Sequence, residues 1–193
     1  PRDWSSDVCS SDLTGERDDA GGGPQKAGVA VADLFTGMYA TVAILAALRH
    51  AQRTGQGQHI DMALLDTQVA MLANLGANHL IHSPPKPPPG RMGNAHVNIV
   101  PYQVFEVAPR DDGSRDFIIV AVGNDGQFAK FCDCLGQPGW AKDDRFALNA
   151  GRVRHRDTLV PMLASVLRTQ TKAHWLSLLE AAKVPCGPIN NLA

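Results

Sequence analysis

The 193-residue sequence predicts an α/β segment, then a proline-rich linker, then a small α+β domain. Three observations support this order. A short run of small apolar residues leads into a long helical repeat. "SPPKPPPG" at 83–90 holds five prolines in eight residues, which favours an extended spacer. Two β-rich runs then precede several helical patterns. We expect the first part at 15–82, the linker at 83–100 and the small domain at 101–193.

The first 14 residues are excluded from this fold prediction. "PRDWSSDVCSSDL" has neither a helical nor a strand period. It also lacks the basic start, continuous apolar core and small-residue cleavage site of a signal peptide. A stretch rich in Ser and Asp buries too little apolar area to offset the entropy of ordering. We therefore expect residues 1–14 to be a non-native or disordered tail.

Composition narrows the possible functions. The formal net charge is −1, and basic residues do not cluster, which argues against a nucleic-acid partner. No apolar run approaches the roughly 18 residues of a spanning helix, so we expect no membrane partner. The four cysteines show no CxxC spacing or matching His pair, so we expect no metal site. Reduced thiols of this kind predict a cytoplasmic protein.

The first part is expected to contain two strands and two helices. The run Val29–Ala32 predicts a short strand, and "QHIDMALLDT" at 58–67 predicts another. Between them, apolar residues recur at three to four positions over 34–53, the period of an amphipathic helix closed by glycines. The pattern over 66–82 predicts a second helix, stopped by prolines.

The small domain is expected to begin with a hairpin. "PYQVFEVA" and "FIIVAVGN" are β-rich runs joined by "PRDDGSRD", a loop longer than the tight two-residue type. A one-sided apolar pattern over 128–135 then predicts a helix that ends at Gly136. The runs 149–170 and 171–183 predict two more helices, the second with Thr171 as N-cap. "VPCGPIN" closes the order as an extended segment.

Asp33 is the carboxylate with the most chemical interest. It lies between the small-residue run and the long helix, where Asp is a favoured N-cap. A helix N-terminus also favours negative charge, and an ionised carboxylate can act as a covalent nucleophile. Gly37, one turn further on, leaves room for a ligand or allows close helix packing. Position in the sequence does not decide between N-cap and nucleophile for Asp33, or between ligand space and helix packing for Gly37.

Five stretches carry a resemblance to a known family. They are "GVAVADLFTGMYATVAILAALRHAQRTGQGQHIDMALLD", "GNAHVNIVPYQVFEV", "FIIVAVGNDGQFAKFC", "DDRFALNAGRVRHRD" and "VPCGPIN". In this order they resemble family III CoA-transferases of the CaiB/BaiF type, the group related to formyl-CoA transferase and carnitine CoA-transferase. The resemblance covers nearly all of Pro24–Ala193. It is strongest to the branch that acts on dicarboxylic acids, such as succinyl-CoA:dicarboxylate CoA-transferase.

The resemblance implies a catalytic role for Asp33. In "ADLFTG" this carboxylate matches the family's nucleophile, which attacks an acyl-CoA thioester to give a mixed anhydride and then an aspartyl-CoA thioester. The coenzyme A thioester is a substrate, and no permanently bound cofactor is implied. The first part would be the remnant of a Rossmann-like large domain. In this family the sequence before the nucleophile supplies most of that domain, and little of it precedes Asp33 here, so we expect the chain to be an internal fragment. Family members form interlocked homodimers, which a fragment could not rebuild, so we expect it to be inactive alone.

The loop after the linker departs from part of the family. Relatives close to formyl-CoA transferase have consecutive glycines there, whereas this chain has "PGRMGNAH". The resemblance assigns Gly93, Asn94 and His96 to a substrate-facing loop, and an ordinary turn is the alternative. An acyl-CoA racemase or isomerase of the same superfamily is a second possible function. Where its supporting Glu is expected, this chain has Asn124 and Asp125, which favours transfer. A noncatalytic binding module is the third possibility.

Overall fold

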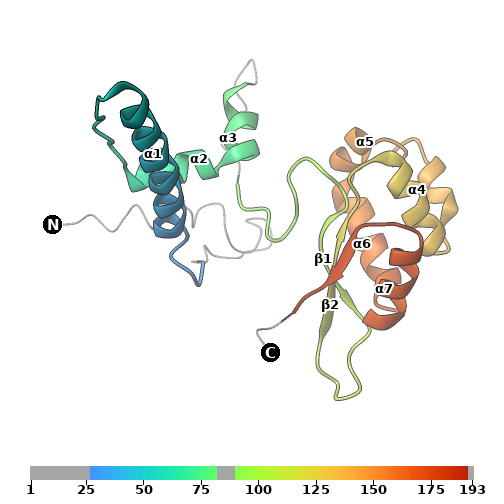
Figure 1. Ribbon diagram of the computed structural model, residues 1–193. Helices are drawn as coiled ribbons and strands as arrows, with labels where there is room; N and C mark the ends of the chain where they lie inside the picture. The colour runs from blue at the N-terminus through green and yellow to red at the C-terminus, as the bar shows by residue number, and fades with distance from the viewer. Residues whose placement is uncertain (1–26, 82–89, 191–193) are drawn as a thin grey trace. The chain divides into compact units, whose positions relative to one another are not determined.

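A computed structural model describes residues 27–81 and 90–190 of the chain. The chain divides into two compact units between Gly93 and Asn94. Figure 1 shows helices in the N-terminal unit and a sheet with helices in the C-terminal unit. Part of the predicted domain limits lies outside the described residues, namely the predicted tail 1–14, residues 83–89 of the predicted linker, and residues 191–193.

The N-terminal unit is described as three helices: α1 (Val31–Thr54), α2 (Leu64–Met71) and α3 (Ala73–Leu80). The long helix predicted over 34–53 is confirmed as α1. It ends at Gly55, which has the left-handed φ of 73° and donates its backbone N–H to the carbonyl of Ala51. Glycine is favoured at this position because it has no Cβ to oppose a positive φ.

Both strands predicted in the first part are wrong. Val31 and Ala32 already belong to α1, and residues 56–63 are irregular. A strand needs a hydrogen-bonded neighbour, and the described part of the N-terminal unit contains no other strand to pair with. The helix predicted over 66–82 is present as α2 and α3. Leu72 separates them, and Ala73, the first residue of α3, has a φ of 43°, a break that no Gly or Pro signals.

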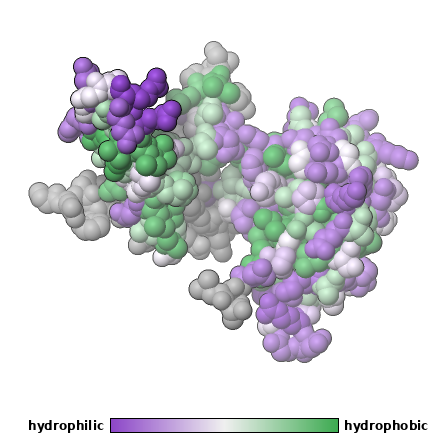
Figure 2. Space-filling model, in the orientation of Figure 1, coloured by the Kyte–Doolittle hydropathy of each residue, from purple (hydrophilic) through white to green (hydrophobic). Residues whose placement is uncertain are grey.

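Helix α1 exposes most of its apolar side chains. Of its 24 residues only Ala32 is buried. Leu34, Met38, Val42 and Leu45 are 58–67% exposed, and Figure 2 shows hydrophobic surface over this helix. Apolar side chains on several sides of one helix are typical of a helix that is surrounded by other protein or by lipid.

The expectation that no apolar run is long enough to span a membrane is wrong for α1. Its most apolar 18-residue window has a mean hydropathy of 1.7. Residues 34–48 of the helix include no charged side chain, and the hydroxyls of Thr36 and Thr41 donate to carbonyls four residues earlier. Length and hydropathy are shared by membrane-spanning helices and by core helices of soluble proteins, so they do not distinguish the two.

The C-terminal unit is built on an antiparallel sheet in the order β1-β2-β3. The strands are β1 (Tyr102–Val107), β2 (Asp116–Ala121) and β3 (Cys186–Pro188). The first two form the predicted hairpin, with Phe105 paired to Ile118. The last strand comes from the predicted extended segment and pairs Ile118 with Pro188. The sheet therefore joins the two ends of the C-terminal unit.

Helices complete the C-terminal unit. They are α4 (Asp125–Cys134), the 3-10 helix η3 (Pro138–Lys142), α5 (Asn149–Arg154), α6 (Arg156–Leu167) and α7 (Lys172–Ala181). The predicted helix stop at Gly136 and N-cap at Thr171 are confirmed, since Gly136 has a φ of 69° and the Thr171 hydroxyl accepts from the His174 N–H. The helix predicted over 149–170 is divided at His155, whose φ and ψ depart from helical values.

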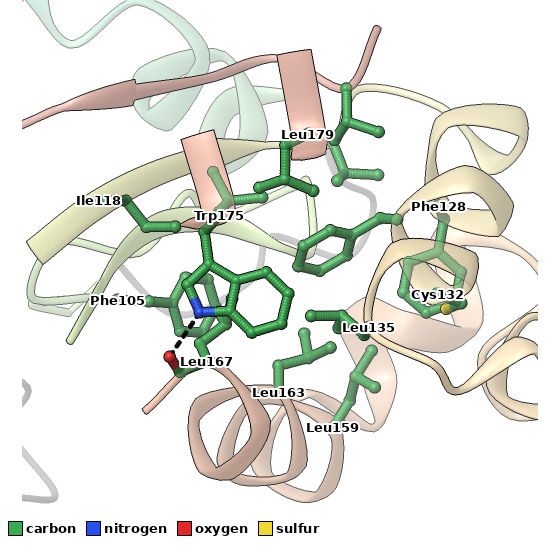
Figure 3. Close-up of a cluster of buried hydrophobic side chains, with 14 of the residues drawn as sticks. Phe105, Ile118, Phe128, Cys132, Leu135, Leu159, Leu163, Leu167, Trp175 and Leu179 are labelled. Atoms are coloured by element: carbon green, nitrogen blue, oxygen red, sulfur yellow. Dashed lines mark hydrogen bonds between the residues drawn. The ribbon is translucent and has the colours of Figure 1, made fainter. Parts of the chain in front are cut away.

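One face of the sheet packs against α4, α6 and α7 to form the core (Figure 3). Phe105 and Val107 on β1 alternate with less buried residues, as do Ile118 and Val120 on β2. This alternation gives the sheet one apolar face. Trp175 lies inside the core, and its indole N–H donates to the Leu167 carbonyl at 2.7 Å. The helices contribute further side chains that are fully buried: Phe128, Phe131, Cys132, Leu159, Leu163, Leu167 and Leu179.

Candidate active site

The candidate nucleophile Asp33 lies in the first turn of α1 and is exposed. The helix begins at Val31 with Ala30 as its N-cap, and no side chain caps it. The interpretation of Asp33 as the N-cap is therefore wrong, because the helix starts earlier than the sequence predicts. The first turn still has unpaired backbone N–H groups and the positive end of the helix dipole, which favour a carboxylate.

Space beside Gly37 is open. A Cβ placed on this residue would meet no heavy atom within 4 Å among the described residues. The close helix packing considered for Gly37 is thus absent from the part of the chain that the structure describes. On the turn before it, the Thr36 hydroxyl donates to the Ala32 carbonyl at 2.7 Å. The helix surface next to Asp33 can accept another group at Gly37 without a side chain in the way.

The residues Asn94 and His96 lie on one loop that leads into β1. The Asn94 side-chain oxygen accepts from the Val104 N–H at 3.0 Å. The His96 backbone N–H donates to the Tyr102 carbonyl at 2.9 Å. The two rings of His96 and Tyr102 stack, with centroids 5.2 Å apart and an interplanar angle of 6°. Residues 94–100, predicted as part of the linker, are thus bonded to the C-terminal unit.

Gly93 precedes this loop with a φ of 62°. A residue with a side chain is strained in that conformation, so glycine is needed for the turn itself. Asp33 and Gly93 fall within the N-terminal unit, and Asn94 and His96 within the C-terminal unit. Of the four predicted site residues, Asn94 and His96 thus share one loop of the C-terminal unit.

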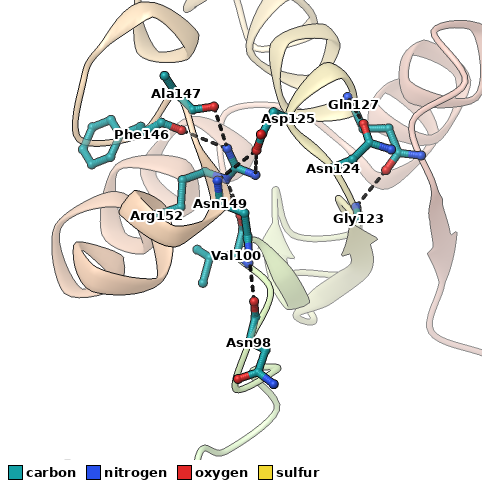
Figure 4. Close-up of polar contacts among 10 residues, drawn as sticks. All are labelled: Asn98, Val100, Gly123, Asn124, Asp125, Gln127, Phe146, Ala147, Asn149 and Arg152. Atoms are coloured by element: carbon teal, nitrogen blue, oxygen red, sulfur yellow. Dashed lines mark hydrogen bonds and ion pairs between the residues drawn. The ribbon is translucent and has the colours of Figure 1, made fainter. Parts of the chain in front are cut away.

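A buried arginine that the sequence did not single out fixes the end of this loop (Figure 4). The Arg152 side chain is fully buried. It donates to the carbonyl of Val100 at 2.7 Å and to those of Phe146 and Ala147 at 2.9 and 3.2 Å. Its remaining nitrogen pairs with the Asp125 carboxylate at 2.9 Å. Buried charges are tolerated where partners of this kind satisfy them.

Neighbouring side chains and backbone pack closely around the buried guanidinium of Arg152. Burial lowers the pKa of Arg152, and the hydrogen bond that Arg152 donates to Asp125 opposes that shift. The guanidinium lies over the Phe128 ring at 4.3 Å from its centroid. A Cβ on the adjacent Gly151 would lie 2.5 Å from the Arg145 carbonyl oxygen, so only glycine lets α5 approach this closely. The arginine therefore ties α5, α4 and the loop into one body.

Asn124 and Asp125, at the position expected for a racemase Glu, both have structural partners. The Asn124 side chain caps α4 by accepting from the Gln127 N–H at 2.9 Å, and Gln127 accepts from Gly123 at 2.7 Å. Asp125 accepts from the Asn149 N–H as well as from Arg152. These contacts hold α4 in place and explain both residues without a proton-transfer role.

Within residues 27–81 and 90–190, no group of three or more His, Cys, Asp or Glu side chains is placed to hold a metal ion. Burial raises the pKa of the Cys132 thiol to about 12. A thiol in that state is a poor nucleophile and a poor ligand at neutral pH. Cys132 is therefore a core residue and not a candidate nucleophile or metal ligand.

Comparison with known proteins identifies relatives along nearly the whole chain. The family model for CoA-transferase family III matches residues 7–193. The chain is 51% identical over 180 residues to succinate–glutarate CoA-transferase of Agrobacterium fabrum, covering 93% of this chain and 42% of that protein. It is 40% identical to succinyl-CoA:glutarate CoA-transferase of Mus musculus, covering 93% and 38%. The chain thus spans about two fifths of the length of these relatives.

Solved structures agree with the fold. A CaiB/BaiF family protein from Brucella suis aligns with a TM-score of 0.67 and 47% identity, over 94% of this chain and 45% of that one. A hypothetical protein of Mycobacterium tuberculosis aligns with a TM-score of 0.76 over 98% and 48%, and at 23% identity it supports the fold alone. By its match to the family model over residues 7–193, the chain belongs to CoA-transferase family III.

Proposed function

We propose that the chain supplies the nucleophile of an enzyme that transfers coenzyme A between an acyl-CoA, such as succinyl-CoA, and a dicarboxylic acid. The observation that carries this proposal is the 51% identity to succinate–glutarate CoA-transferase over 180 residues, a match that includes most of both units. Because the chain spans 42% of that relative, the activity is proposed for the whole protein to which such a chain belongs.

The proposed reaction passes through covalent intermediates on Asp33. Its carboxylate attacks the thioester carbonyl, the C–S bond breaks, and a mixed anhydride and CoA thiolate result. The thiolate attacks the aspartyl carbonyl of the anhydride, which releases the free acid and leaves an aspartyl-CoA thioester. The acceptor carboxylate then displaces the thiolate to form a second anhydride. Attack of the thiolate on the acceptor's carbonyl gives the new acyl-CoA and restores Asp33.

Three local features support Asp33 as the nucleophile. The carboxylate is exposed, so a thioester can reach it. It lies in the first turn of a 24-residue helix, whose positive end favours the ionised form that must attack. The open space beside Gly37 admits a substrate to the same face. Orientation of two weakly reactive partners in such a site can supply roughly 7–11 kcal/mol of the barrier.

We also propose that the whole protein is an interlocked homodimer. Support comes from α1, whose apolar side chains are exposed although a helix of this composition needs cover. Sequence outside the described residues, from the same or a second copy, would provide that cover. We further propose that the whole protein is located in the cytoplasm, as expected from its reduced cysteines.

The proposal is tested by placing the chain in a complete enzyme. Residues 24–193 replace the matched segment of the Agrobacterium fabrum enzyme, to which they are similar enough for exchange. The graft is incubated with succinyl-CoA and its intact mass is measured. We expect an adduct equal to CoA less one water, and loss of that adduct in Asp33→Asn. Asp61→Asn, which alters another exposed carboxylate of the same unit, serves as the matched control.

The outcomes separate the possible functions. An adduct that needs Asp33 but not Asp61 supports covalent CoA transfer. A folded graft that forms no adduct, yet exchanges the α-proton of a branched acyl-CoA in deuterated water, identifies a racemase or isomerase instead. A folded graft with neither activity contradicts the enzymatic proposal and leaves a binding module.

A further inference from the structure

Gly37 lies inside helix α1, where the described part of the fold does not require a glycine. Its φ is not in the left-handed region, in contrast to that of Gly55 at the end of the same helix. A Cβ at position 37 would meet no heavy atom within 4 Å among the described residues. Alanine favours a helix more than glycine does, so propensity does not account for this glycine either. The explanation is therefore to be sought in what occupies the open space beside Gly37.

This open space is next to the candidate nucleophile Asp33. Residues four apart on an α-helix are neighbours on one face, with Cβ atoms about 5–6 Å apart. Because each Cα–Cβ bond tilts toward the helix N-terminus, a side chain at position 37 would lie over the turn that carries Asp33. The hydroxyl of Thr36 is turned to the backbone, where it donates to the Ala32 carbonyl at 2.7 Å. Of these two positions one turn after Asp33, one thus has no side chain and the other directs its hydroxyl away.

The anhydride proposed on Asp33 determines where the acyl group must lie. In that intermediate the acyl carbonyl carbon is bonded to a carboxylate oxygen of Asp33. The next carbon of the acyl chain is therefore held within a few covalent bonds of the surface of α1, the surface to which the open space at Gly37 belongs. This proximity follows from the covalent bond and from α1 alone, whatever the placement of the C-terminal unit.

We propose that Gly37 is a specificity residue for CoA transfer, because its missing side chain leaves room for the carbon next to the acyl carbonyl while the acyl group is bonded to Asp33. This inference rests on the proposed function and names a residue that limits which acyl-CoA donors react. A branched side chain at position 37 would fill that room and displace the acyl group. Misplacing a reacting group by about 1 Å can cost roughly 100-fold in rate, and one methyl group in a fitted site changes rates by roughly 10- to 200-fold.

The graft described above tests this role with two side chains of increasing size, in Gly37→Ala and Gly37→Val. Two donors are compared, namely succinyl-CoA and succinyl-CoA with a methyl group on the carbon next to the thioester carbonyl. The rate constant of adduct formation is measured by intact mass after rapid quenching, and thermal melting reports whether each variant is folded. Gly57→Val is the matched control, since Gly57 is an exposed glycine of the same unit whose Cβ position is also clear of described heavy atoms within 4 Å.

We expect the parent graft to react with both donors. Gly37→Val should slow adduct formation from succinyl-CoA by roughly 10- to 100-fold, and from the methylated donor by about 10-fold more. Gly37→Ala should slow succinyl-CoA by less than about 3-fold and the methylated donor by more than that. Gly57→Val should leave both rate constants within about 2-fold. A ratio of the two rate constants that rises with side-chain size at position 37 is a result that a merely structural glycine would not give.

A constant ratio across the series would overturn the inference, whether both rate constants fall together or neither changes, while the CoA transfer of the parent graft stands. Equal falls together with a lower melting temperature would assign Gly37 to helix packing instead. If Gly37→Val fails to fold, the ratio measured for Gly37→Ala decides. A folded parent graft that forms no adduct with either donor would overturn the proposed function itself.

Discussion

Helix α1 of the N-terminal unit and helix α6 of the C-terminal unit have similar apolar patterns but opposite environments. Leu159, Leu163 and Leu167, spaced four residues apart on α6, are fully buried. Leu34, Met38 and Val42, spaced four apart on α1, are 58%, 65% and 67% exposed. The pattern predicts a helix in both cases, but within the described residues only α6 buries its apolar side. Periodicity shows that a helix has an apolar side and does not show what covers it.

Among substitutions that test this comparison, we expect the largest loss of stability at Arg152, in the closed core of the C-terminal unit. Arg152→Met leaves the carbonyls of Val100, Phe146 and Ala147 without their donor in a buried region. We expect the free energy of unfolding of the C-terminal unit to fall by about 3–5 kcal/mol. Urea unfolding followed by the fluorescence of the buried Trp175 measures the change.

The matched control for Arg152 is its exposed helix neighbour Arg154, since Arg154→Met removes the same charge from the same helix. We expect that change to stay within about 0.5 kcal/mol. Similar losses in the two variants would mean that net charge, and not the buried contacts of Arg152, determines stability.

An identical truncation on the two helices tests the comparison directly. Leu163→Ala creates a cavity in the closed core, and we expect it to cost about 2–4 kcal/mol of unfolding free energy. Leu45→Ala on α1 removes a side chain that is 61% exposed, so we expect less than about 0.5 kcal/mol. Both are measured by urea unfolding, with hydrogen exchange used to follow α1. A large cost for Leu45→Ala in the 193-residue chain would show that α1 is already covered there.

We expect the smallest change in stability from protonation of the Asp116 carboxylate at low pH. Burial raises the pKa of Asp116, but hydrogen bonds from Lys172 and Arg110 outweigh it and hold that pKa below its usual value of 3.8. A lowered pKa in the folded state means that the ionised carboxylate stabilises the unit above about pH 4. This stabilisation is lost as the pH falls through the folded-state pKa.

The acid effect is measured as the dependence of the urea midpoint on pH between about 5 and 2. Asp116→Asn should lower the midpoint near neutral pH and flatten its fall with acid, because the variant has no carboxylate to protonate at this position. A slope equal to that of the parent would assign the acid sensitivity to other carboxylates, such as Asp143, whose pKa is lowered to about 2 by Arg145.

Features that depend on nearby residues were predictable from the sequence. The hairpin of β1 and β2 follows from two β-rich runs and a short loop, and the N-cap at Thr171 follows from its residue type. The start of α1 was misplaced because no capping side chain marks it. The break at Ala73 has no local signal either, since alanine is the residue that favours a continuous helix most.

The site was predictable only in part. Asp33 was found through the family resemblance, and the structure adds its place in the first turn of α1. Arg152 was missed because its partners lie on three separate segments of the chain, and an arginine in "NAGRVRHRD" looks like any other until those segments meet.

The third strand has a consequence for how the chain is made. Ile118 on β2 pairs with Phe105, which is synthesised earlier, and with Pro188, which is synthesised later. At a translation rate of about 5–20 residues per second, the hairpin waits on the order of seconds for its last strand. During that interval one edge of β2 is open to other chains. Newly made copies on neighbouring ribosomes can therefore pair with this edge of β2 before β3 of the same chain does.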